Sequence, residues 1–298
     1  MALELIHLKG KTSYIKGAVN VGVYDRGDGK CILVDSGLDE SSGRQLLRCL
    51  EGANLTPCAV INTHSHADHF GANKFVRNRT GARFWATSFE KAVIENPLLE
   101  PVFLFSAVPV KEMRTKFLMG QPCPVDHVLS AGRQEIAGIS MEIVDLAGHA
   151  PEQVGVVTPD DVFFAADAFV SGDIVEKYRL PYMADLVAAK ESLRRVGSMS
   201  HSWVVPSHGR PTRDPGADIA VNLRKITETE ALILKLAGEG ATRETIFSGV
   251  VEAYGINLGP EQYVLVFATV SAYLAGLCAE GRLRMRFAGP QLLWAADC

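Results

Sequence analysis

The 298-residue sequence lacks the features that would indicate a membrane, an export route or a polyanionic partner. No stretch reaches the roughly 18 continuous apolar residues that a membrane-spanning helix needs. The first residues, MALELIHLKGKTSYIKG, have no charged start, long apolar centre or small-residue cleavage site typical of a signal peptide. The net charge is only −4, so there is no general attraction to nucleic acid or anionic lipid. We therefore expect a cytoplasmic protein without membrane contact.

The sequence also lacks a cysteine framework. Its six cysteines include no C-x-x-C pair, and in a chain of this length they are typical of reduced, mostly buried thiols. Hydrophobic residues make up 47% of the chain and charged residues 21%, which indicates a globular protein with a sizeable core.

The pattern of predicted helices and strands divides the chain into two parts. In the first, short strands alternate with amphipathic helices: two strands within 18–37 are joined by an Asp-Gly turn, and a helix over 41–51 follows a serine cap. Such alternation favours sheets covered by helices. The second part has three helical segments and a terminal hairpin, a set that resembles a winged-helix unit. The sequence thus predicts an α/β catalytic domain over 1–213 and a winged-helix-like domain over 214–298.

Three of the eight histidines lie in one six-residue stretch, HSHADH at 64–69. Histidines two apart in an extended loop point the same way, so His64 and His66 can share one ion. Asp68 and His69 can serve a second ion nearby. Imidazole together with carboxylate suits zinc first, with iron or manganese as alternatives. Packing these groups together gains little unless something binds them, so the stretch indicates a metal site.

Three more side chains occupy matching positions, at or after the ends of predicted strands: His149, Asp167 and His208. Strand ends are where sheet folds gather their sites. We expect two metal sites that share a bridging Asp167, the first formed by His64, His66 and His149 and the second by Asp68, His69 and His208. The remaining candidates, His7, His127 and His201, are interpreted as ordinary core or surface histidines.

These segments resemble, in order, the ligand motifs of the metallo-β-lactamase superfamily. THSHADH is similar to its H-x-H-x-D-H signature, and the later Gly-His, strand-end aspartate and Ser-His-Gly resemble the other motifs. VDSG at 34–37 resembles its early Asp-x-Gly element, which implies that Asp35 supports the metal ligands. The resemblance covers about residues 10–213 and implies an αββα sandwich with the metals at one edge between the sheets.

The resemblance also narrows the branch. Zinc β-lactamases commonly have a cysteine where this chain has Asp167, so the aspartate is more similar to the glyoxalase II, lactonase and nuclease branches. The flavodiiron branch has glutamate in place of His66 and carries a flavodoxin domain, which this chain lacks. A lactamase-type domain followed by a winged-helix-like domain resembles the lactamase-beta-like-2 type, which carries endoribonuclease activity.

We therefore expect a hydrolase with two zinc ions that cleaves a small ester-like substrate, a thioester or lactone, by attack of a metal-bound hydroxide. Asp68 is expected to orient the nucleophile and pass its proton to the leaving group. A metal-dependent endoribonuclease or phosphodiesterase is the alternative, favoured by an arginine stripe at 282, 284 and 286 but opposed by the acidic balance of residues 215–298. A non-catalytic metal-binding interaction module is a third hypothesis.

Two segments are candidates for substrate contact. The apolar stretch 98–108 could wall a pocket for an acyl chain or form a homodimer contact. The loop after Asp167 offers Lys177, Tyr178, Arg179 and Tyr182, which fit either substrate binding or an ordinary solvated loop.

Overall fold

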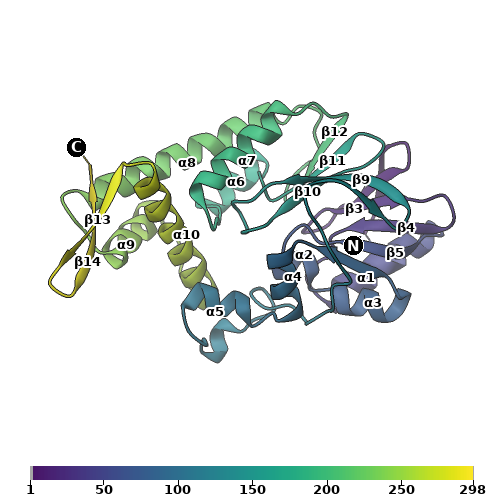
Figure 1. Ribbon diagram of the computed structural model, residues 1–298, viewed down its shortest axis with the longest axis horizontal. Helices are drawn as coiled ribbons and strands as arrows, with labels where there is room; N and C mark the ends of the chain where they lie inside the picture. The colour runs from purple at the N-terminus through teal and green to yellow at the C-terminus, as the bar shows by residue number, and fades with distance from the viewer. Residues whose placement is uncertain (1–2, 298) are drawn as a thin grey trace.

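The computed structural model describes residues 3–297, in which two packed sheets are flanked by helices and followed by a mostly helical C-terminal part (Figure 1). The first sheet has the order β1-β2-β3-β4-β5-β6-β7 and the second the order β12-β11-β10-β9-β8. The strands of the first sheet are Leu5–Lys9, Thr12–Ile15, Val21–Asp25, Lys30–Val34, Thr56–Ile61, Arg83–Ala86 and His127–Val128. Those of the second, from β8 to β12, are Gly132–Ile136, Ile139–Asp145, Val154–Val157, Val162–Ala166 and Trp203–Pro206.

Strand direction brings several loops to one edge of the sandwich. In the first sheet β4, β5 and β6 run parallel. In the second sheet β11 and β12 are parallel, and β9 runs the same way because it is two antiparallel steps from β11. The C-terminal ends of β9, β11 and β12 therefore share an edge, where polar side chains from separate segments can meet.

The core lies in layers, as the αββα prediction requires. Between the sheets are packed apolar side chains such as Ile61, Ile143 and Phe164. The helices α1 (Glu40–Gly52) and α3 (Asn73–Thr80) cover the outer face of the first sheet through residues such as Leu46 and Val76. The helix α7 (Leu186–Ser198) covers the second sheet. Short helices complete this part: α2 (Ala67–Phe70), α4 (Ser88–Glu95), α5 (Leu99–Phe105), the 3₁₀ turn η1 (Lys111–Met113) and α6 (Gly172–Tyr178).

Of two local predictions, the hairpin turn is confirmed and the cap of the first helix is wrong. The predicted hairpin over 18–37 is confirmed as β3–β4, with Gly27 and Gly29 at φ +89° and +75° in its turn. The predicted serine cap of α1 is wrong: the helix begins at Glu40, and the side chain of Asp39 accepts from the backbone N–H of Ser42. A carboxylate shortly before the serines takes the role.

The C-terminal part contains the three helices and the hairpin that the sequence predicts. They are α8 (Gly216–Ala237), α9 (Arg243–Tyr254), α10 (Pro260–Ala279), β13 (Leu283–Ala288) and β14 (Gln291–Ala296). Their apolar side chains join those of the second sheet and α7 in one cluster, for example Ile233 and Val270 with Phe163 and Leu193. Packing is therefore continuous across residue 213, and the division into two domains there stays a prediction.

Helix α10 satisfies the length and composition of a membrane span, with a mean hydropathy of 1.6. Half of that stretch is buried within the protein. Val266, Val270 and Leu277 belong to the core cluster shared with α7 and α8, a position that accounts for its apolar character.

Candidate metal centre

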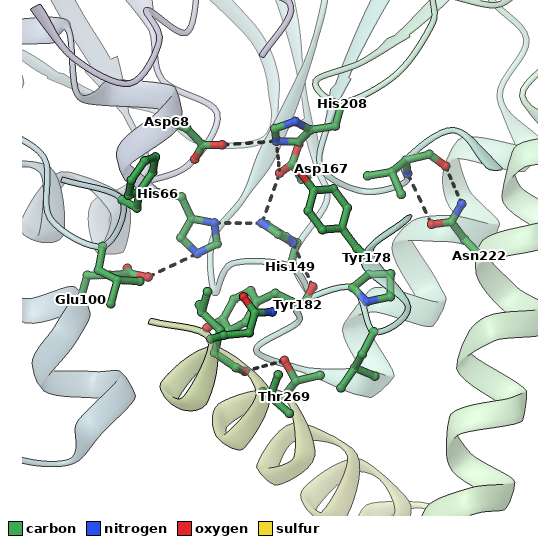
Figure 2. Close-up of a pocket in the computed structure, with 18 residues that line it drawn as sticks. His66, Asp68, Glu100, His149, Asp167, Tyr178, Tyr182, His208, Asn222 and Thr269 are labelled. Carbon is green, nitrogen blue, oxygen red and sulfur yellow. Dashed lines mark hydrogen bonds and ion pairs between the residues drawn. The ribbon is translucent and has the colours of Figure 1, made fainter. Parts of the chain in front are cut away.

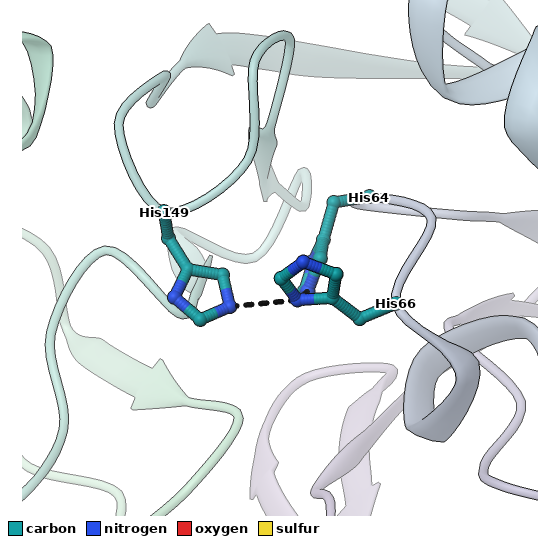
Figure 3. A group of neighbouring side chains, drawn as sticks. All are labelled: His64, His66 and His149. Carbon is teal, nitrogen blue, oxygen red and sulfur yellow. Dashed lines mark hydrogen bonds between the residues drawn. The ribbon is translucent and has the colours of Figure 1, made fainter. Parts of the chain in front are cut away.

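The first metal-site candidates converge at the edge of the sandwich. His64 and His66 lie in the loop between β5 and α2, and His149 follows β9. His66 Nδ1 lies 3.1 Å from His64 Nε2 and 2.9 Å from His149 Nε2 (Figure 3). Two ligand atoms at about 2.0–2.1 Å from one tetrahedral zinc ion lie about 3.3–3.4 Å apart. The three nitrogens thus have nearly the spacing that a shared ion requires.

A second group is formed by Asp68, His69 and His208. His208 Nε2 lies 3.3 Å from one oxygen of Asp68, and His69 Nε2 lies 3.9 Å from the other. His208 follows β12, so this group joins the loop after β5 to the far end of the second sheet. The two groups that the sequence predicts as separate sites are therefore both assembled.

Asp167 lies between the two groups. Its Oδ2 is 3.3 Å from His149 Nε2 and 3.4 Å from His208 Nε2 (Figure 2). The same oxygen is 3.5 Å from His69 Nε2. Asp167 directly follows β11, and its side chain is almost fully buried. One carboxylate oxygen within reach of histidines from both groups has the position expected of a bridging ligand.

In each histidine of the centre, the ring nitrogen that faces away from the candidate ion position contacts another group of the protein. His149 Nδ1 contacts the backbone oxygen of Tyr182 at 3.1 Å, and His208 Nδ1 contacts that of Ala18 at 3.0 Å. A carbonyl oxygen can only accept, so both Nδ1 atoms carry a proton, and the Nε2 atoms are the ones left to ligate a metal. For His66 the roles are exchanged, because its Nε2 lies 3.5 Å from Glu100 Oε1. These contacts fix the tautomers that metal ligation needs.

Asp35 orients histidines of both groups. Its Oδ2 accepts from His69 Nδ1 at 2.7 Å and from Thr63 Oγ1 at 2.8 Å, while its Oδ1 accepts from the backbone N–H of Thr63. Since the Thr63 hydroxyl donates to Asp35, it can accept from His64 Nδ1, 3.0 Å away. Asp35 is buried and has φ +66° at the end of β4. The supporting role that the resemblance implies for Asp35 agrees with these contacts.

A buried glutamate, Glu90, connects two of the ligand loops. Its Oε2 accepts from the backbone N–H of Ser65 at 2.9 Å and from the Ser65 hydroxyl at 2.5 Å, and its Oε1 accepts from the N–H of Glu152 at 2.9 Å. Ser65 lies between two candidate ligands, and Glu152 lies three residues after His149. The sequence gives no signal for this role, because Glu90 occupies an ordinary position in a short helix.

Close backbone packing holds the His149 loop. Gly148 has φ +133°, and a β-carbon there would lie 2.3 Å from the backbone nitrogen of Ala189 in α7. The carbonyl of Gly148 also accepts from the backbone N–H groups of Ala184 and Asp185. Only glycine fits this approach, so the loop is held against the start of α7.

Two buried polar atoms at the centre have no hydrogen-bond partner within residues 3–297. They are His69 Nε2 and Asp167 Oδ1, and both belong to residues grouped around the candidate ion positions. An unsatisfied buried polar atom costs about 1–3 kcal/mol, and two such atoms in one site indicate a missing ligand. Imidazole nitrogens and carboxylate oxygens are ligands for zinc and related divalent ions, so the residues fit a metal pair.

The protonation states without metal follow from burial and neighbouring charge. Burial and the adjacent histidines lower the pKa of His64, and they lower that of His66 to about 3. Against the effect of burial, the carboxylate of Asp167, with Asp68 close by, raises the pKa of His69 to about 10 and of His208 to about 11. Metal binding must therefore displace protons from the second group.

The three histidines that the sequence analysis sets aside lie in ordinary contacts. His7 contacts the backbone oxygen of Gly10, His127 stacks on Trp85 with ring centroids 4.5 Å apart, and His201 contacts Asp161. None of them belongs to the groups of potential ligands within residues 3–297.

A cavity of about 350 Å³ opens onto the centre (Figure 2). Tyr178 and Tyr182 line it, whereas Lys177 lies over the Tyr178 ring and Arg179 donates to backbone oxygens near α9. The apolar stretch 98–108 divides: Glu100 faces the cavity, whereas Phe103 and Val108 are exposed. Burial, with Glu90 and Asp68 nearby, raises the pKa of Glu100 to about 8.

Comparison with known proteins places the chain in a family context. The family model of the metallo-beta-lactamase superfamily matches residues 14–208. A curated relative from Bacillus subtilis, "Probable metallo-hydrolase YqgX", is 26% identical over 149 residues, which are 50% of this chain and 62% of that protein. A "Beta-lactamase hydrolase-like protein" from Xylella fastidiosa is 35% identical over 75 residues, 22% of this chain and 17% of that protein. The chain thus spans less than two thirds of either relative.

Two solved structures match nearly the whole chain. A beta-lactamase domain protein from Burkholderia ambifaria aligns with a TM-score of 0.74 at 18% identity, covering 98% of this chain and 94% of its own. A metallo-beta-lactamase family protein from Thermus thermophilus aligns with a TM-score of 0.73 at 20% identity, covering 99% of both chains. At these identities the likeness concerns the fold, and it includes the helices after residue 213.

Proposed function

The chain belongs to the metallo-beta-lactamase superfamily, and we propose that it is a hydrolase with two zinc ions that cleaves a small ester-like substrate, a thioester or lactone. The observation that carries this proposal is the convergence of five histidines and two aspartates, in which each histidine directs one ring nitrogen to one of two adjacent groups of candidate ligands. In the proposed assignment the first ion is held by His64, His66 and His149 and the second by Asp68, His69 and His208. Asp167 bridges them.

A metal pair held by these residues would lower the pKa of a water molecule and polarise the carbonyl oxygen of the substrate. The protein's own contribution starts with Asp68, whose side chain lines the cavity and is 37% exposed, unlike the buried Asp167. Its carboxylate can hold the attacking water by a hydrogen bond, accept the proton and deliver it to the leaving group. Asp35 and Glu90 keep the histidine loops in place during the reaction.

The branch and the C-terminal unit belong to the same proposal. The aspartate at position 167 supports a glyoxalase II-like or lactamase-beta-like-2-type chemistry over β-lactam hydrolysis. The order of three helices and a hairpin supports a winged-helix-like unit, as does the pairing of Ala241, between α8 and α9, with Trp294 of β14. In this proposal the unit serves the catalytic cavity, not a nucleic acid.

The contacts of the arginine stripe weaken the nuclease alternative. Arg282 pairs with Glu230 and Glu280, Arg284 Nε lies 3.5 Å from Asp297, and Arg286 donates to the backbone oxygen of Glu239. Phosphate binding depends on basic groups that are free to neutralise it. Two of the three arginines already face carboxylates, so the stripe has less positive charge to offer a phosphate.

The test is turnover by zinc-reconstituted protein on acyl thioesters, lactones, a phosphodiester and single-stranded RNA. The control is the double variant His64→Ala, His66→Ala. We expect metal-dependent cleavage of a thioester or lactone that the double variant loses. RNA cleavage that disappears in the variant, with no ester turnover, would overturn the substrate proposal and leave the metal assignment standing.

A further inference from the structure

The cavity over the metal centre has a floor and walls of contrasting character. The floor consists of candidate ligands, among them His66, His149 and Asp167. The walls come from three other places: the stretch after α5 with Leu118, the loop 178–182, and the helices α8 and α10 (Figure 2). Helix α10 contributes Gln262, Leu265, Val266 and Thr269, so a C-terminal element forms part of the catalytic cavity.

No lysine or arginine of the described residues 3–297 lines this cavity. The nearest cations of the adjacent loop are engaged elsewhere: Lys177 lies 5.3 Å from the centre of the Tyr178 ring, and Arg179 donates to the backbone oxygens of Tyr254 and Gly255. The titratable side chain of the wall is instead a carboxylic acid, Glu100. A phosphate or carboxylate group held inside this cavity, away from the candidate metal ligands, would therefore meet no lysine or arginine side chain.

Two polar side chains of the helical wall, Thr269 and Asn222, already have hydrogen-bond partners within the protein. The Thr269 hydroxyl donates to the backbone oxygen of Leu265 at 2.8 Å. The Asn222 amide donates to the backbone oxygens of Val170 and Asp218, and its oxygen accepts from the N–H of Val170. These groups hold the wall together, and what they leave facing the cavity is largely hydrocarbon.

The wall is also firmly packed. Leu118 forms a buried cluster with Leu104 of α5 and Val264 of α10, and Leu265 packs against it. Val266 is buried in the main core. A preformed apolar wall beside a polar reaction centre is the usual arrangement for binding an apolar part of a small molecule.

We propose that the substrate is an uncharged acyl compound, an ester, lactone or thioester of a neutral carrier, whose hydrocarbon chain lies against α10. This inference rests on the proposed hydrolase function and narrows it. Water adds to the acyl carbon and the carbon–oxygen or carbon–sulfur bond breaks. The acid product keeps the oxygen of water, and the leaving oxygen or sulfur takes a proton. Anionic carriers such as coenzyme A or glutathione, and RNA, fit this cavity less well, because no lysine or arginine lines it to compensate their charge.

The charge of the carrier is tested with two thioesters that share one acyl group. Hexanoyl-N-acetylcysteamine is neutral, whereas hexanoyl-coenzyme A carries phosphates. We expect the zinc-loaded protein to have a kcat/KM at least tenfold higher for the neutral compound. Equal or higher activity on the coenzyme A ester would overturn the charge argument while the hydrolase function stands. No turnover of any ester, lactone or thioester would instead contradict the proposed function itself.

The position of the chain is tested with neutral esters of increasing acyl length. Each added methylene that reaches the wall should raise kcat/KM by up to about fourfold, until the cavity is filled. Leu265→Phe narrows the cavity, so it should shift the optimum of kcat/KM to shorter acyl chains. Leu236→Ala, at a partly buried leucine of α8 outside the cavity, is the matched control. A flat length dependence, or the same profile in both variants, would overturn the placement against α10.

Discussion

The carboxylate of Glu90 is expected to set both the stability of the protein and the affinity of the first metal site. It is buried and accepts three hydrogen bonds, two from Ser65 and one from the backbone of Glu152. Glu90→Ala leaves two backbone N–H groups without an acceptor, that of the buried Ser65 and that of the partly buried Glu152, at up to about 1–3 kcal/mol each. We therefore expect the free energy of unfolding to fall by about 2–6 kcal/mol, and by about half as much in Glu90→Gln, which keeps one oxygen.

The effect on metal binding follows from the position of these contacts. Ser65 lies between His64 and His66, so loosening it displaces both from His149. Loss of such support typically weakens metal affinity by about 10–100-fold. Urea unfolding with chelator present measures the first effect, and competition with a fluorescent zinc indicator measures the second. The matched control is Glu95→Gln on the same helix, which contacts Lys91 and the backbone of Val125 and is remote from the ligand loops. A Glu90→Gln protein with wild-type stability and zinc affinity would refute the reasoning.

Three further predictions rest on single contacts. Asp35→Asn removes the anionic acceptor of His69 Nδ1 and should lower zinc affinity about 10–100-fold in the same competition assay; unchanged affinity would contradict its orienting role. Gly148→Ala forces a β-carbon against the backbone of α7 and should cost stability in thermal unfolding, whereas a wild-type midpoint would show that the loop can move. The ion pair with Arg77 lowers the pKa of Asp126 to about 2 in the folded protein, below its value in the unfolded chain. The contribution of this pair to stability is therefore present above about pH 4 and is lost as the pH falls toward 2. Asp126→Asn should flatten the dependence of the free energy of unfolding on pH in that window, and an unaltered slope would contradict this.

The candidate site could be predicted largely because its ligands lie in short, chemically distinctive segments. HSHADH is recognisable within six residues, and His149, Asp167 and His208 each mark the end of an apolar strand. The strands β9, β11 and β12 run parallel in the folded protein, and this direction brings their C-terminal ends to one edge. The hairpin β3–β4 was equally predictable, because its turn chemistry is local.

Apart from Asp35, the supporting residues could not be predicted, because their roles exist only after folding. Glu90 and Glu100 lie in short helices without a motif, and their contacts with the ligand loops span residues far apart in sequence. The edge strands β1 and β8 could not be identified since they are partly exposed and lack a clear apolar alternation. The choice of Asp39 over a serine as the cap of α1 depends on where the chain leaves β4, which the sequence does not specify.

The central claim is that seven side chains hold two metal ions bridged by Asp167. It is tested most directly by counting zinc equivalents per chain, after reconstitution and removal of free metal, by mass spectrometry. We expect two zinc equivalents for the wild type and for His201→Ala, because His201 lies outside the centre. We expect fewer than one for Asp167→Ala, since both proposed sites lose a ligand. Two tightly held equivalents in Asp167→Ala, or fewer than two in His201→Ala, would contradict it.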